Sequence, residues 1–233
     1  MQNTNMISTR SLDKAYKDGG VSHPVLQAVD LEVTAGECVA LLGRSGSGKS
    51  TLLNLLAGID RPDAGEVRVG GQDLHRLPER ERTLFRRRHI GFVYQFFNLI
   101  PTLSVAENIR LPMELNGWTE SRMSERVRQL LADLGLGGRE NDHPDRLSGG
   151  EQQREAIARA MAHEPSLLLA DEPTCNLDAE TGRHMLELLL RIGRESGHTL
   201  LVVSHSLEVA RIADRLLLLE DGRLLEGGAE LAW

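Results

Sequence analysis

The chain has 233 residues, 40% of them hydrophobic, which is enough for one α/β domain with a lobe inserted in it. Its formal net charge of -7 argues against wholesale binding to a phosphate backbone, and an aromatic content of 3% argues against a stacking surface for single-stranded nucleic acid. We therefore expect no nucleic acid partner.

Targeting and cysteine signals indicate a cytoplasmic protein. The polar stretch Met1–Arg10 lacks the apolar segment of a signal peptide, and no apolar run approaches the ~18–20 residues that a membrane-spanning helix needs. Cys38 and Cys175 lie far apart in the sequence, which predicts a reducing compartment. Cys38 belongs to an apolar run and is expected to be buried, and the eight histidines lack metal-ligand spacing.

The first part of the chain predicts strands. Residues Val29–Thr34 and Glu66–Val69 alternate in polarity, as half-buried strands do. Between them, Cys38–Leu42 is continuously apolar, which is typical of a strand buried on both faces. A Gly/Ser-rich loop follows it, and then a predicted helix over Lys49–Ala57.

The middle of the chain predicts helices. Ser104 and Glu107 have the spacing of a capping box. An apolar stripe then ends at Gly135 and consists of Met123, Val127, Leu130, Leu131 and Leu134.

Helices and strands alternate in the last third. The predicted elements are a helix from about Gly150 to Ala162, a strand Leu167–Ala170, a helix from about Ala179 to Ser196 and a strand Thr199–Val203. Such alternation predicts a parallel sheet covered on both faces.

A phosphate-binding loop joins the apolar strand to the first helix. The loop fits the pattern G-x-x-x-x-G-K-[ST], and the preceding strand and following helix supply its structural context. Its backbone N–H groups should surround phosphate oxygens, Lys49 should reach the β- and γ-phosphates, and Ser50 should ligate Mg²⁺. The residues expected to contact ATP are Gly43, Arg44, Ser45, Gly46, Ser47, Gly48, Lys49, Ser50 and Thr51.

Two acidic residues end the strand that begins at Leu167. Ligands of open parallel sheets bind at the carboxyl ends of strands, so Asp171 is expected to reach the Mg²⁺ shell. Glu172 is placed to act as the general base for a water that attacks the γ-phosphate.

The segment Leu147–Arg154 reads LSGGEQQR and begins a helix. Ser148 and Glu151 have capping-box spacing, and Gly149 and Gly150 permit a phosphate to approach the helix N-terminus. This second anion site lies on a different lobe from the first. We therefore expect two chains to associate head-to-tail, each closing over the ATP of the other.

With this segment the sequence resembles the ABC ATPase family over essentially its whole length. The resemblance implies roles for four further sites. Gln95 would link Mg²⁺ to the transmembrane contact, and Tyr16 would stack on adenine. The segment Asn176-Leu177-Asp178 resembles the D-loop at the dimer interface, and His205 would be the catalytic switch residue at the γ-phosphate, beside Glu172 and Lys49. Cys175 departs from the glycine that close relatives carry before the D-loop.

The family also predicts the fold: an α/β P-loop NTPase (RecA-like) core with a mainly parallel sheet, an N-terminal antiparallel β subdomain and an inserted helical signature subdomain. One ABC domain would span residues 1–233, with the helical lobe at about residues 98–162.

The segment His89–Ile109 resembles the LolD/MacB-like group of bacterial ATP-binding subunits. Members of that group drive separate membrane permeases that act on lipoproteins, peptides, macrolides or envelope components. The resemblance implies a cytoplasmic subunit that is peripheral on the inner membrane and meets its permease after Gln95, where Phe96, Phe97, Leu99 and Ile100 would form an apolar groove. About half of these apolar residues could instead fill the core of the helical lobe.

Two other functions share these motifs. A nucleotide-gated regulator of a cell-envelope complex would carry the same residues, and only its partner would distinguish it. A DNA-associated ABC ATPase is disfavoured because the chain lacks the sustained heptads of a long coiled-coil insertion. The cluster Arg86–Arg88 is interpreted as a solvated helix face, with the permease or anionic lipid headgroups as alternative contacts.

Overall fold

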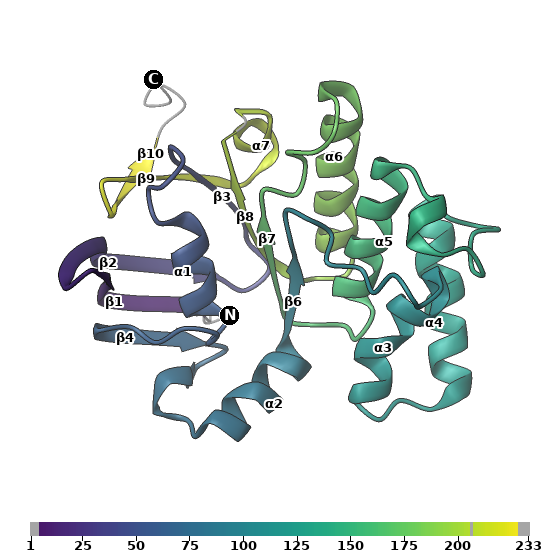
Figure 1. Cartoon of the computed structure of the whole chain (residues 1–233), viewed down its shortest axis with the longest axis horizontal. Coiled ribbons are helices and arrows are strands. Elements are labelled where there is room, and N and C mark those ends of the chain that lie inside the picture. The colour runs from purple at the N-terminus through teal and green to yellow at the C-terminus, as the bar shows by residue number, and fades with distance from the viewer. Residues whose placement is uncertain (1–4, 206, 228–233) are drawn as a thin grey trace.

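The computed structural model describes residues 5–205 and 207–227, which form two sheets with helices around them (Figure 1). The ends of the predicted 1–233 domain, and with them the start of the polar N-terminal stretch, lie outside the described residues. None of the helices in these two ranges is long and apolar enough to cross a membrane.

An antiparallel sheet forms the N-terminal part of the described chain. Its strand order is β2-β1-β4-β5. Strands β2 and β4 contain the two predicted alternating segments, but β1 was not predicted. The strands are β1 (Asn5–Asp18), β2 (Val21–Thr34), β4 (Ala64–Val69) and β5 (Gln72–Asp73).

A mainly parallel sheet forms the centre of the molecule, in the order β10-β9-β3-β8-β7-β6. Strand β10 pairs antiparallel with β9, and the other pairs are parallel. The predicted double-sided burial of Cys38–Leu42 is confirmed, and Cys38 is 3% exposed. These strands are β3 (Cys38–Leu42), β6 (Ile90–Val93), β7 (Leu167–Asp171), β8 (Thr199–Ser204), β9 (Arg215–Glu220) and β10 (Arg223–Gly227).

The three helices that were predicted with both ends begin and end within one residue of their predicted positions. The two predicted capping boxes, Ser104 with Glu107 and Ser148 with Glu151, are both present. The helices are α1 (Lys49–Leu56), α2 (Glu79–His89), α3 (Val105–Leu115), α4 (Glu120–Asp133), α5 (Gly149–Met161), α6 (Ala179–Glu195) and α7 (Leu207–Ile212), with 3₁₀ turns at Leu74–Arg76 and Pro144–Arg146.

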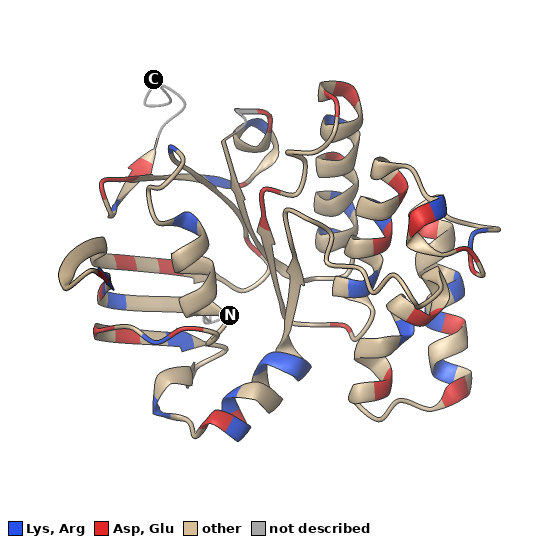
Figure 2. Cartoon of the chain, in the orientation of Figure 1, with Lys and Arg blue, Asp and Glu red and all other residues tan. Residues whose placement is uncertain are grey.

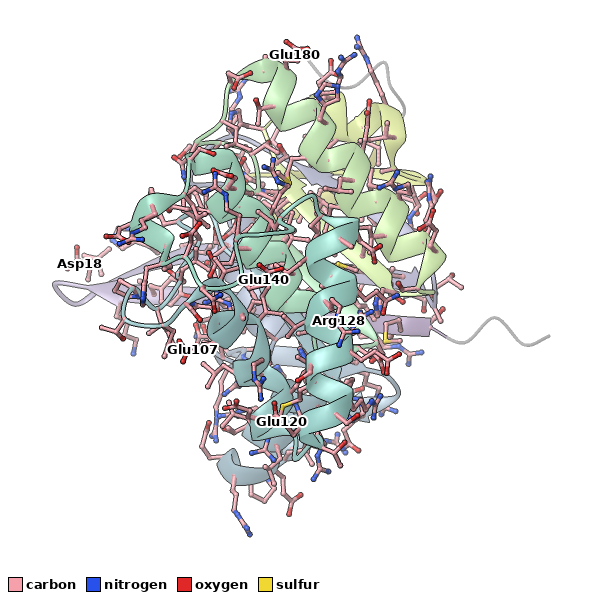
Figure 3. The ribbon with its side chains drawn as sticks, turned by 90° about the vertical axis from the view of Figure 1, so that its right-hand side faces the viewer. Asp18, Glu107, Glu120, Arg128, Glu140 and Glu180 are labelled. Atoms are coloured by element: carbon pink, nitrogen blue, oxygen red, sulfur yellow. The ribbon has the colours of Figure 1, made fainter. Side chains whose placement is uncertain are left out.

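Helices α3, α4 and α5 lie in the chain between β6 and β7, which are neighbours in the parallel sheet. The stripe predicted on α4 is buried, while Figure 3 shows Glu120 and Arg128 of that helix pointing outward. In Figure 2 the central strands of the parallel sheet are mostly tan, whereas the antiparallel sheet and the outer helices carry charges of both signs. The predicted fold class is confirmed.

Gly91 allows helix α5 to approach strand β6 closely. A Cβ atom built on Gly91 would lie 2.6 Å from Leu168 Cδ2 and closer still to the carbonyl oxygen of Ala160. A backbone atom cannot move aside as a flexible side chain can. Gly91 therefore sets the distance between the last turn of α5 and the sheet.

We expect Gly91→Ala to lower the free energy of unfolding by about 1–3 kcal/mol, because the added methyl group overpacks a filled interface. Gly137→Ala is the matched control, since a Cβ there meets nothing within 4 Å. Urea unfolding followed by circular dichroism measures both. Equal unfolding midpoints for Gly91→Ala and Gly137→Ala would contradict the close-approach argument.

Candidate functional site

The loop between β3 and α1 contains glycines with backbone conformations that other residues rarely adopt. Gly48 adopts φ 103° at the N-cap of α1, and a Cβ there would lie 2.8 Å from the carbonyl oxygen of Val25. Gly46 also has positive φ, 81°. The hydroxyl of Ser47 is buried and has no hydrogen-bond partner among the described residues. The loop thus offers a glycine-lined cradle with an unsatisfied polar group.

Lys49 points back into this loop. Its Nζ donates to the carbonyl oxygens of Gly43 at 2.7 Å and Arg44 at 2.9 Å, and the residue is 7% exposed. The ammonium group therefore sits inside the curl of the loop, where a bound phosphate would meet it.

Ser50 and Asp171, both predicted from sequence to lie near Mg²⁺, come together in the structure. Burial raises the pKa of Asp171, while a hydrogen bond from Ser50 and the charge of Lys49 act in the opposite direction. Asp171 Oδ1 is buried without a hydrogen-bond partner in the described chain. A buried carboxylate oxygen of this kind is costly to leave unsatisfied and fits a hydrated divalent cation.

Glu172 and His205 contact each other directly. Glu172 Oε2 lies 2.7 Å from His205 Nδ1 and also accepts a 3.3 Å hydrogen bond from the His205 backbone. The neighbouring strands β7 and β8 carry these residues at their carboxyl ends. Glu172 adopts φ 47°, and its N–H donates to the Val203 carbonyl oxygen at 3.0 Å. Two of the three predicted catalytic residues, Glu172 and His205, therefore form one unit beside Asp171.

Gln95 follows β6 and is joined to the D-loop through its backbone. Its carbonyl oxygen accepts a 2.7 Å hydrogen bond from Asn176 Nδ2, and Cys175 Sγ lies 4.0 Å from it. The Cys175 thiol thus contacts the Gln95 segment. The sequence patterns did not predict this contact, because the two segments lie 81 positions apart.

The signature segment begins α5. Ser148 is the N-cap residue, and its Oγ accepts from Glu151 N at 3.3 Å. Asp178, expected at the dimer interface, caps α6 by accepting from Thr181 N at 3.0 Å. Figure 1 places α5 and α1 on opposite sides of β7, so the signature and the phosphate loop do not converge within one chain.

Residues 26–175 match the family model described as ABC transporter. The chain is 49% identical over 220 residues to an uncharacterised ABC transporter ATP-binding protein of Mycobacterium tuberculosis, covering 94% of this chain and 89% of that one. It is 47% identical over 219 residues to the lipoprotein-releasing system ATP-binding protein LolD 2 of Caulobacter vibrioides, covering 94% and 96% of the two chains.

Among solved structures, the dimeric post-hydrolysis form of the ATP-binding cassette MJ0796, bound to ADP and Pi, superposes with a TM-score of 0.87. It is 39% identical, and the match covers 95% of this chain and 98% of that one. The chain therefore belongs to the ABC transporter family, as an ATP-binding and ATP-hydrolysing subunit that uses Mg²⁺. The resemblance drawn from its motifs is confirmed.

Proposed function

We propose that two copies of this chain bind two ATP molecules head-to-tail and drive a membrane permease of LolD/MacB-like type. ATP hydrolysis is supported by five residues that lie together at the carboxyl ends of the parallel strands: Lys49, Ser50, Asp171, Glu172 and His205. Ser50, Asp171 and Gln95 would hold Mg²⁺, which supplies positive charge against the β- and γ-phosphates.

In this proposal Glu172 takes the proton of the attacking water, and His205 holds the carboxylate in place. Lys49 and the loop Gly43–Thr51 orient the phosphates, and the face of Tyr16 stacks on adenine. Ser148, Gly149 and Gly150 of the second copy close over the γ-phosphate, and Asp178 lies at the contact between the copies. The dimeric state of MJ0796 supports this arrangement.

The segment after Gln95 is the proposed permease contact. Phe96 is 68% exposed and Ile100 is 36% exposed, whereas Phe97 and Leu99 are half-buried. Exposed apolar side chains of this kind suit an amphipathic helix. Helix α2, basic at its C-terminal end in Figure 2, leads into β6 and this segment. Of the cluster Arg86–Arg88, interpreted from sequence as a solvated face, only Arg88 is exposed, and it would be the residue to face anionic lipid headgroups; Arg86 is half-buried and donates to the Gly58 carbonyl oxygen at 3.0 Å.

We propose that the subunit is cytoplasmic and peripheral on the inner membrane, held there by the permease. The whole of residues 1–233 would act as one ABC domain, with residues 98–162 as the lobe that carries the signature. The naming of the Caulobacter vibrioides relative favours lipoproteins or other envelope components as the cargo.

Affinity purification of the Glu172→Gln variant from membranes tests this function. One integral membrane protein should co-purify with ATP present. Adding Phe96→Asp should abolish co-purification of that membrane protein. Adding Leu225→Asp should leave co-purification intact, because Leu225 is 45% exposed on β10, at the opposite edge of the sheet from β6. Co-purification of a cell-envelope complex without a permease would support the regulator, and ATPase activity stimulated by duplex DNA would support the DNA-associated alternative.

A further inference from the structure

Tyr16 is held by its hydroxyl group at the end of a hairpin. It lies near the end of β1, and Asp18, the last residue of that strand, stands at the edge of the molecule in Figure 3. The Tyr16 hydroxyl donates a 2.8 Å hydrogen bond to Asp60 Oδ2, although the residue is 43% exposed. Asp60 belongs to the turn after α1, and its backbone N–H donates to Asn54 of that helix at 3.3 Å.

Lys14 completes the cluster. Lys14 and Tyr16 are two residues apart on one strand and point to the same face of it. Lys14 Nζ donates to Asp60 Oδ1 at 3.1 Å and to the Arg61 carbonyl oxygen at 2.7 Å. The ammonium also lies 5.0 Å from the centroid of the Tyr16 ring, within the range of a cation–π contact.

The electrostatics agree with this geometry. Partial burial acts to raise the pKa of Asp60, but hydrogen bonds from Tyr16, Arg61 and Lys14 outweigh it and lower that pKa. Burial, and then the hydrogen bond to Asp60, raise the pKa of Tyr16. Both directions favour a charged Asp60 carboxylate beside a neutral Tyr16 phenol, so the hydrogen bond between them is charge-assisted.

The cluster also connects to the phosphate loop. Thr51, in the first turn of α1, acts to lower the pKa of Tyr16, opposite to the effect of Asp60. Asp60 ties the Tyr16 hydroxyl to the turn that follows the helix beginning with Lys49. Lys14 lies over one face of the ring, so a planar ligand would stack on the other face.

We infer that Asp60 and Lys14 are positioning residues that hold Tyr16 in place as the stacking platform for the nucleobase. This rests on the proposed stacking role of Tyr16. An unrestrained tyrosine on an exposed hairpin would lose rotamer freedom when ATP binds, and holding it beforehand removes that cost. Every base has a π-face, so the platform should favour ATP and GTP alike over the phosphates alone.

Calorimetric titration with Mg·ATP, Mg·GTP and inorganic triphosphate tests the inference. Tyr16→Phe keeps the ring and removes only the hydroxyl group, and Asp60→Ala removes its acceptor. Each should weaken both nucleotides about two- to tenfold, the effect of one side chain left unfixed. The affinity for inorganic triphosphate should stay unchanged. The double variant Tyr16→Phe/Asp60→Ala should bind ATP no more weakly than whichever single variant has the lower affinity. Both substitutions remove the same hydrogen bond, so their effects should not add.

Two further variants distinguish a failure of the proposed stacking role from a failure of the positioning role. Tyr16→Ala should weaken ATP about 5- to 100-fold by removing the stacking itself, and Asp18→Ala on the hairpin should change nothing. Unchanged affinity in Tyr16→Ala would overturn the stacking role. A loss in Tyr16→Ala without one in Tyr16→Phe and Asp60→Ala would overturn the positioning role alone. Equal losses for ATP and triphosphate in Asp60→Ala would also overturn it, because Asp60 would then act on the phosphate loop.

Discussion

Replacing Glu172 by Gln is expected to slow ATP hydrolysis by a factor of about 10²–10⁴, the usual contribution of a general base, while ATP affinity stays the same. The amide has the shape of the carboxylate but cannot accept the proton of the attacking water. The backbone bond of Glu172 to Val203 does not involve the side chain, so the strand end should keep its conformation. Single-turnover hydrolysis and equilibrium ATP titration give the two quantities.

The same variant should accumulate as a closed dimer. Without hydrolysis, ATP stays bound between the two chains, and light scattering after gel filtration should show twice the mass of the chain only when ATP is present. Glu180→Gln at the exposed start of α6 is the matched control and should turn over normally. Normal turnover in Glu172→Gln would show that another group is the base.

Replacing Lys49 by Ala is expected to weaken ATP binding about 10- to 100-fold, because a hydrogen bond to a charged group contributes about 1.5–3 kcal/mol. Lys49 is 7% exposed and aimed into the phosphate loop. Lys17→Ala, on the exposed end of β1, is the matched control. Calorimetry measures affinity, and thermal unfolding checks that the variant is folded. An unchanged affinity would contradict the phosphate-loop assignment.

Local patterns predicted the parts of the fold that depend on neighbouring residues. The apolar run Cys38–Leu42 and the two capping boxes need no distant partner, and both are present. Strand β1 escaped prediction because its register with β2 and β4 shifts at several points and Ser11 adopts φ 44° there, which breaks the alternation. Bulges of this kind can be recognised only against the paired strand.

The residues of the site also divide into those that one continuous segment predicts and those that depend on distant segments. The phosphate loop is one continuous segment, so its residues could be assigned together. The contact of Glu172 with His205 depends on β7 and β8 being neighbours, and the cluster of Lys14, Tyr16 and Asp60 joins segments 46 positions apart without any motif. One signal was available: Asp178 and Thr181 have helix-capping spacing, which predicts the observed cap of α6.

The close approach at Gly91 has a mechanical consequence. It fixes the C-terminal end of α5 against the sheet, while Ser148 begins the helix at its other end. Thirteen residues make a rod about 20 Å long. Pivoting that rod by about 10° at Gly91 would carry its tip through about 3 Å, roughly the length of one hydrogen bond. A small turn at the edge of the sheet is thus enough to move Ser148 through the length of one hydrogen bond.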